Sequence, residues 1–200
     1  MVRLPIRTVV LGSVLTAALA GLLPAQVQIG PLVGAYYATR NVIEQSDGTS
    51  AKQATSVALG ARISAATQNK IGFDGSITYV PSDVTATNGA SGGSADLLLL
   101  SARGLMAFGA AESRTRFYLA AGPAIIVRNG EFYADFDGTT DFGGDVAVGV
   151  RLALGKVVGR VEVESYLYAV NLKGAGGLST GSELQADIVA SATIAIPLGP

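Results

Sequence analysis

Glu162 and Glu164 are the residues whose type and spacing most resemble a catalytic pair. They lie two positions apart in a segment of alternating polarity, so both carboxylates share one face of a strand. Two carboxyl groups about 5–5.5 Å apart or wider can serve as acid and nucleophile, or acid and base, in glycoside hydrolysis. Neighbours of this kind are also common on strands, and Arg160 lies beside them. We therefore favour ion pairing over catalysis for this pair.

Two loop segments have the composition of ligand-binding loops. Asp135, Asp137 and Asp141 are close in sequence, and hard cations such as Ca²⁺ prefer several carboxylates on a flexible turn. The full spacing and the closing Glu of a calcium loop are absent, so a solvated acidic loop is the expected structure. Residues 91–94 are rich in Gly and Ser, but no Lys followed by Ser or Thr comes at the offset that a phosphate-binding loop requires. A flexible loop tip is the expected structure.

The composition removes whole classes of chemistry. His and Cys are both absent, which excludes Ser-His and Cys-His nucleophiles, zinc–thiolate sites and disulfides. The formal net charge of −1 shows no basic excess, so no nucleic-acid partner is expected. We expect no catalytic residue, no metal site and no cofactor.

Ten ionisable residues share the polar face of the alternating segments: Arg62, Asp74, Arg103, Arg116, Asp145, Arg151, Arg160, Glu162, Glu164 and Asp187. Five are basic and five are acidic. They could form a polar path for ions or protons, or a salt-bridge network that fills a closed interior. The alternating segments number about eight, and a barrel of eight strands has an interior only just wide enough for side chains. Burying an unpaired charge in such an interior costs several kcal/mol. We therefore predict the salt-bridge network.

Strict alternation of apolar and polar residues recurs in about eight segments and is clearest at 146–154, where Val146, Val148 and Val150 share one face. The predicted strands lie near 27–40, 53–67, 71–81, 96–108, 116–129, 146–154, 157–170 and 186–198. Long and short connections alternate between them. This rhythm predicts an all-β fold, an eight-stranded antiparallel up-and-down transmembrane β-barrel, with three short turns at one rim and four long loops at the other.

A soluble barrel would alternate as well, with its polar face outward and a ligand inside. Two observations favour the membrane barrel. The four lysines, Lys52, Lys70, Lys156 and Lys173, fall in turns, loops or strand ends, whereas a solvated face would use Lys freely. The charges on the polar face are Arg with Asp and Glu, and Arg suits confined pairing with carboxylates.

The first residues are typical of a signal peptide. Arg3 and Arg7 form a positive region, and residues 9–23 are uncharged. Residues 23–25 (Leu-Pro-Ala) offer a cleavage site, with 18–20 (Ala-Leu-Ala) as a second candidate. An uncleaved anchor is the alternative, but the apolar stretch is short for a spanning helix. We expect a cleaved signal peptide at 1–25 and a single barrel domain at 26–200.

Hairpin rhythm and face polarity resemble the small eight-stranded outer-membrane barrels of the OmpA/OmpX type over the whole mature chain. The resemblance implies a cell outer-membrane location, contact with membrane lipid, and insertion by the barrel-assembly machinery. We also expect a monomer. An aromatic girdle would come from outward residues, namely Tyr37, Tyr79, Phe108, Phe117 and Phe142. Family members often end in an aromatic residue, and this sequence ends in Gly199 and Pro200.

Two function classes follow. The first is a structural or surface-interaction barrel with a filled polar lumen and long extracellular loops. The second is a barrel that binds or transports a small apolar molecule. This molecule could be carried by a membrane barrel or, alternatively, by a soluble lipocalin-like carrier. Clustering of Leu97, Leu99 and Leu105 inside would favour transport, whereas continuous ionic filling would favour the structural barrel. An enzyme is the least supported class.

Overall fold

The structure is a computed structural model that describes residues 26–44, 50–66, 70–86, 91–110, 112–170, 172–174 and 183–198. The predicted signal peptide at 1–25 lies outside the described residues. The same holds for parts of three of the predicted loops and of two short turns.

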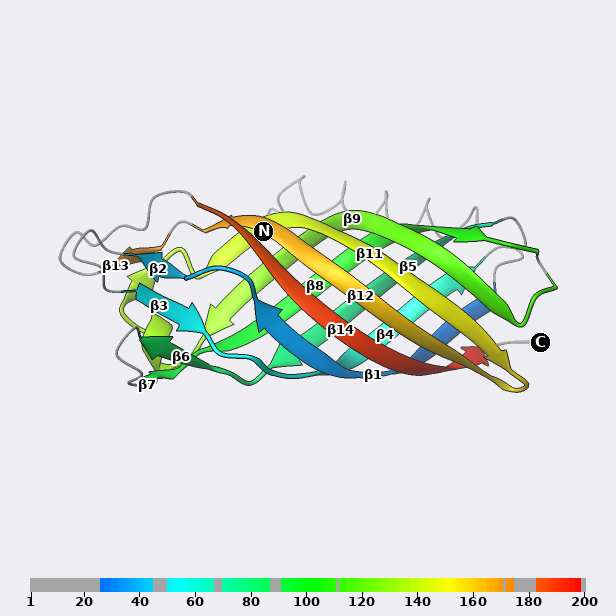
Figure 1. Cartoon of the computed structure of the whole chain (residues 1–200), viewed down its shortest axis with the longest axis horizontal. Coiled ribbons are helices and arrows are strands. Elements are labelled where there is room, and N and C mark those ends of the chain that lie inside the picture. Colours follow the sequence, from blue (N-terminus) through cyan, green and yellow to red (C-terminus); the bar gives the residue numbers. More distant parts are fainter. Residues whose placement is uncertain are drawn as a thin grey trace, which may run out of the picture.

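Eight antiparallel strands close into a barrel in the order β1-β14-β12-β11-β9-β8-β5-β4 (Figure 1). The barrel strands are β1 (Gln26–Ala38), β4 (Ser56–Ala66), β5 (Ile71–Val80), β8 (Asp96–Phe108), β9 (Thr115–Asn129), β11 (Thr140–Leu154), β12 (Val157–Val170) and β14 (Glu183–Leu198). Each neighbour in the barrel except β1 and β14 is also the neighbour in sequence. The predicted fold class is confirmed.

The strands are strongly staggered. Backbone pairing leads from Val27 around all eight strands and returns to β1 at Tyr37, about ten residues further along. A stagger of this kind tilts the strands by roughly 35–45° to the barrel axis. Tilt brings side chains from distant parts of the sequence to one level of the lumen.

Burial alternates along the strands, with polar side chains inside and apolar side chains outside. On β11, Val146 and Val148 are exposed whereas Asp145 is fully buried. No water-soluble barrel exposes so continuous an apolar band, and the lipocalin-like alternative is therefore wrong. None of the four lysines lies in a barrel strand. The uncharged band is the surface that a membrane barrel presents to lipid.

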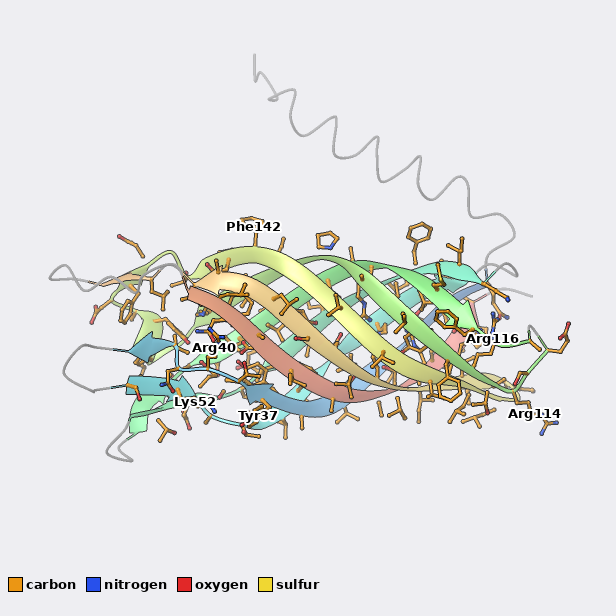
Figure 2. The ribbon with its side chains drawn as sticks, turned by 45° about the horizontal axis from the view of Figure 1, so that its top comes forward. Tyr37, Arg40, Lys52, Arg114, Arg116 and Phe142 are labelled. Carbon is orange, nitrogen blue, oxygen red and sulfur yellow. The ribbon has the colours of Figure 1, made fainter. Side chains whose placement is uncertain are left out.

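Aromatic side chains lie near both edges of this band. Tyr37 and Phe142 are exposed towards the end that carries the long connections, which we call the loop end (Figure 2). Tyr79 is exposed at the same end, one residue before β5 ends at Val80. Phe108 and Phe117 are exposed at the opposite rim, which we call the turn end, and they face each other directly across β8 and β9. The predicted girdle residues thus form two sparse rings. Amphipathic aromatic rings favour membrane–water interfaces.

The loop end is more ordered than the sequence indicated. β2 (Ile43–Glu44), β3 (Ser50–Gln53), β6 (Asp83–Ala86) and β7 (Ser91–Ser94) form a four-stranded sheet, and β10 (Phe136–Asp137) pairs with β13 (Lys173–Gly174) (Figure 1). The 3₁₀ turn η1 (Glu131–Tyr133) adjoins them. The prediction of plain loops was wrong here, because hairpin pairing continues past the lipid band without needing apolar alternation.

Strand boundaries also differ from those that the sequence predicts, because backbone pairing rather than apolar alternation sets them. β11 begins at Thr140, six positions before the clear alternation at Val146, because Thr140 still pairs with Val127 of β9. β4 begins at Ser56 rather than near residue 53, since Gln53 belongs to the separate strand β3. Backbone pairing sets where each strand begins and ends. Apolar periodicity does not show these boundaries, because pairing continues outside the apolar segments.

Candidate functional site in the barrel lumen

Arg103 of β8 is the centre of an ion network in the middle of the lumen. Its guanidinium lies 2.8 Å from Asp74, 2.9 Å from Glu162, 2.9 Å from Glu164 and 3.1 Å from Asp145. All five side chains are buried. The fork of a guanidinium offers several donors in fixed directions, which lets one arginine join carboxylates from three other strands.

Two further arginines complete the network. Arg62 of β4 binds both Glu162 and Glu164. Arg160 of β12 lies 2.7 Å from Asp74 and donates to Ser64. Three arginines and four carboxylates from five of the eight strands thus meet across the bore.

The register explains this meeting. Asp74 and Arg103 are direct partners across β5 and β8. Glu162 and Glu164 point inward from β12 because side chains two apart on a strand share a face. Both glutamates are buried and ion-paired, so neither is a free acid or base for a substrate arriving from solvent. The arrangement holds the strands together and obstructs the bore.

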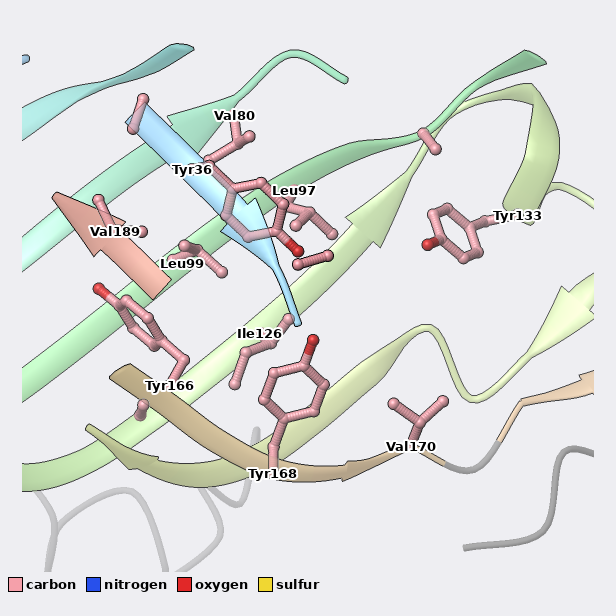
Figure 3. Close-up of a cluster of buried hydrophobic side chains, with 14 of the residues drawn as sticks. Tyr36, Val80, Leu97, Leu99, Ile126, Tyr133, Tyr166, Tyr168, Val170 and Val189 are labelled. Carbon is pink, nitrogen blue, oxygen red and sulfur yellow. The ribbon is translucent and has the colours of Figure 1, made fainter. Parts of the chain in front are cut away.

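Above the network, towards the loop end, an apolar and aromatic cluster crosses the lumen (Figure 3). It contains Tyr36, Val80, Leu97, Leu99, Ile126, Tyr166, Tyr168 and Val189. Figure 3 shows these side chains converging from strands on opposite walls. Asp187 belongs to this layer rather than to the ion network, because its carboxylate accepts hydrogen bonds from Tyr36 and Tyr168.

An ion pair and a buried tyrosine close the loop end. Arg128 of β9 pairs with Asp141 of β11, and its guanidinium lies 5.2 Å from the ring centre of Tyr168. The Tyr133 hydroxyl donates to Gln53 at 2.8 Å. Burial raises the pKa of Tyr133 to about 12, so this hydroxyl remains a donor at neutral pH.

The turn end of the lumen has a different character. Arg116 is buried and Arg151 half-buried, and neither belongs to the ion network. Of the ten predicted residues, the structure therefore brings seven together, places Asp187 among tyrosines, and leaves these two arginines beside a cavity. All ten lie on the inner face of the barrel.

Sequence reasoning missed several residues that complete these layers. The Tyr118 hydroxyl donates to Glu162, and Arg160 lies over the Tyr118 ring at 4.6 Å. Gly149 makes room for that ring, since a Cβ there would lie 2.4 Å from its hydroxyl. Tyr118 has the same strand parity as Arg116, so alternation predicts that it faces inward, but not that it contacts Glu162 and Arg160. Asp141 was assigned to a loop, so its inward position was not predicted.

The predicted calcium-like segment shows no ligand set. Asp137 is exposed and its backbone pairs with Lys173, while Asp141 is engaged with Arg128. In the ranges that the structure describes, no three His, Cys, Asp or Glu side chains are grouped to hold a metal ion. Within those same ranges, no helix has the length and apolar character needed to cross a membrane.

Comparison with known proteins gives a match in fold but none in sequence. No protein-family profile matches the chain, and no curated protein matches it. Among solved structures, the outer membrane protein OprG from Pseudomonas aeruginosa matches with a TM-score of 0.58 at 13% identity, over 86% of this chain and 93% of OprG. AlkL in lipid bilayers matches with a TM-score of 0.57 at 14% identity, over 88% and 92%.

Neisserial surface protein A has the same fold, with a TM-score of 0.53 at 15% identity, over 87% of this chain and 97% of that protein. All three are similar to this chain along nearly their whole lengths. Together with the closed eight-stranded topology and the uncharged exterior, the likeness identifies the architecture. The chain has the fold of the small eight-stranded outer-membrane β-barrels, with a lipid-facing exterior and an ion-paired lumen.

Proposed function

We propose that this protein is a non-conducting outer-membrane barrel that anchors a folded surface at its loop end. The observation that carries the proposal is the filling of the lumen by successive layers. The ion network centred on Arg103 joins five strands, and the aromatic cluster around Tyr36 and Tyr168 lies above it. A barrel of eight strands leaves little room beside such side chains.

The loop end supports a role in surface contact. Backbone hydrogen bonds continue the pairing of its sheet towards the barrel: the N–H of Ala54, in the link between β3 and β4, donates to the carbonyl of Asp83 in β6 at 2.8 Å. The ring of Phe132 stacks on Phe136 and meets Tyr133 edge-on, with ring centres 5.7 and 5.0 Å apart. Pairing and stacking of this kind give a shaped platform, which costs less entropy on binding than a flexible loop. In barrels of this type the long connections face the cell exterior.

We further propose that the protein works as a monomer, inserted by the barrel-assembly machinery. Closure supports the monomer, because β1 pairs with both β14 and β4 and the barrel sheet therefore has no free edge that a second copy would have to cover. The apolar exterior is satisfied by lipid.

Planar-bilayer recording tests the proposed function. We expect the purified protein to produce no large, stable single-channel steps, because ion-paired side chains and packed rings block the bore. As a control, a known porin should conduct in the same bilayers. Large steps from the wild-type barrel would contradict the filled lumen and favour a channel.

Binding of a small apolar molecule is the second candidate. It is favoured by the apolar cluster beneath the loop end, which contains Leu97 and Leu99 but not Leu105. The chain has no Trp, so tyrosine emission can be followed directly. Saturable quenching by a small aromatic hydrocarbon, lost on replacement of Leu99 by Asn, would favour this candidate over the structural barrel.

A further inference from the structure

Three arginines line up at the turn end of the lumen. Arg116 of β9 is the direct cross-strand partner of Arg151 of β11, and Arg151 is the partner of Arg160 of β12. The three side chains therefore lie on one face and form a continuous row across three adjacent strands. Like charges directly opposite each other destabilise a sheet. The repulsion within this row must therefore be offset by another interaction.

The row of cross-strand partners Arg116, Arg151 and Arg160 contains no carboxylate of its own. Arg160 is held from the network side by Asp74 and Ser64. In contrast, Nε and Nη2 of Arg116 and Nε of Arg151 are buried and find no hydrogen-bond acceptor among the protein groups that the structure describes. Arg116 is only 9% exposed. Burying such donors without an acceptor is costly, more so for a charged group.

A cavity lies against this row. Arg116, Arg151 and Arg160 line it together with Lys70, and Gln28, Ser64 and Tyr118 add uncharged polar groups. Among the described residues that line it there is no Asp or Glu. Lys70 is exposed and stands at the short connection between β4 and β5, so the cavity meets solvent at the turn end. Four cations thus face one small space.

We propose that this cavity is a binding site for an oxyanion, specifically a phosphate group. A guanidinium presents parallel N–H donors that match two phosphate oxygens, and charge-assisted bonds of this kind are the strong ones. Water can enter about 30 Å³ of the cavity, which is the space of about two waters. In the proposed complex, two phosphate oxygens accept hydrogen bonds from Arg116 and Arg151, and the rest of the group stays at the mouth beside Lys70.

The turn end gives the ligand two possible sources. In outer-membrane barrels the short turns face the periplasm, so the phosphate comes either from a free soluble anion or from the headgroup of a lipid in the inner leaflet. The recognition chemistry is the same for both. The two sources differ in whether the group must reach the cavity from water or from the membrane plane.

Thermal unfolding with added inorganic phosphate tests the site. The barrel is refolded in a glycoside detergent, which carries no phosphate of its own, and chloride at matched ionic strength is the reference. We expect phosphate, but not chloride, to raise the unfolding midpoint in a saturable way. We expect Arg116→Gln and Arg151→Gln to weaken the apparent affinity by about tenfold or more.

Arg114→Gln is the matched control, because Arg114 is exposed directly before β9, two residues from the buried Arg116 at the same end of the barrel (Figure 2). Nanodiscs made with a phosphate-bearing lipid or with a glycolipid separate the two sources. A response to lipid phosphate alone assigns the headgroup, and a response to free phosphate assigns the soluble anion.

If the glutamine variants fail to fold, phosphate titration of the wild-type arginine Nε–H resonances replaces them. We expect at least two of these resonances to shift with phosphate and not with chloride. Two results would overturn the proposal. The first is an unfolding midpoint or spectrum that changes with neither free nor lipid phosphate. The second is a loss of phosphate affinity that is equal in Arg114→Gln and Arg116→Gln.

Discussion

Val148→Arg is expected to abolish most of the membrane assembly of this barrel. Val148 is 54% exposed at the middle of β11, and its cross-strand partners Val163 and Leu119 are also outward and apolar. A guanidinium at this place would lie in the hydrocarbon of the bilayer. On transmembrane barrels, Arg near the midplane costs about 2–4 kcal/mol, which is a large part of the stability of an ordinary small domain.

Ala147→Ser is the control, because Ala147 precedes Val148 on the same strand but faces the lumen opposite Glu164. A hydroxyl there stays within the polar chemistry of the interior. The folded fraction can be measured as heat-modifiable migration on gels after refolding into lipid vesicles. Equal folded yields of the two variants would show that the assignment of faces is wrong.

Arg103→Met is expected to give the largest loss of stability among lumen substitutions. The guanidinium of Arg103 contacts Asp74, Asp145, Glu162 and Glu164, and the side chain is 2% exposed. Met fills similar volume without charge, so packing is largely kept while buried carboxylates lose their main partner. Removing one member of a buried ion pair costs about 3–5 kcal/mol.

Arg114→Met is the comparison for this loss, since Arg114 is exposed at the turn end and we expect its replacement to change stability little. Urea unfolding in lipid vesicles measures the free energy of unfolding for both variants. A loss for Arg103→Met no greater than that for Arg114→Met would mean that the network contributes nothing to the folded barrel.

Face polarity made the fold predictable from sequence. Along the segment that contains Val146, Val148 and Val150, each residue reports which side it faces, and one misplaced charge on the apolar side would have broken the pattern. The alternation of long and short connections then fixed the hairpin order. Both signals are local, so they can be read from this chain although no family profile and no curated protein matches it.

The layering of the lumen was not predictable in the same way. Parity showed that Arg103, Arg116 and Asp187 face inward, but not at which level each lies. Level depends on the stagger around the whole barrel, which places Arg103 among carboxylates, Asp187 beside Tyr36, and Arg116 beside Arg151. Stagger is set by the pairing of all eight strands and is invisible in any one segment. The loop-end sheet was missed because its short strands lack apolar alternation.

Spin-label accessibility along β11 and β12 tests the membrane-barrel architecture most directly. The chain has no Cys, so single cysteines at Val146, Val148, Val161 and Val163 carry the label at defined outward positions. Lys156, exposed in the turn between these strands, supplies the aqueous reference. We predict that the four valine labels collide with lipid-dissolved oxygen far more than with a water-soluble nickel chelate, with Val148 and Val163 deepest, and that the label at Lys156 shows the reverse. Valine labels that favour the nickel chelate as strongly as the label at Lys156 would contradict a lipid-facing exterior.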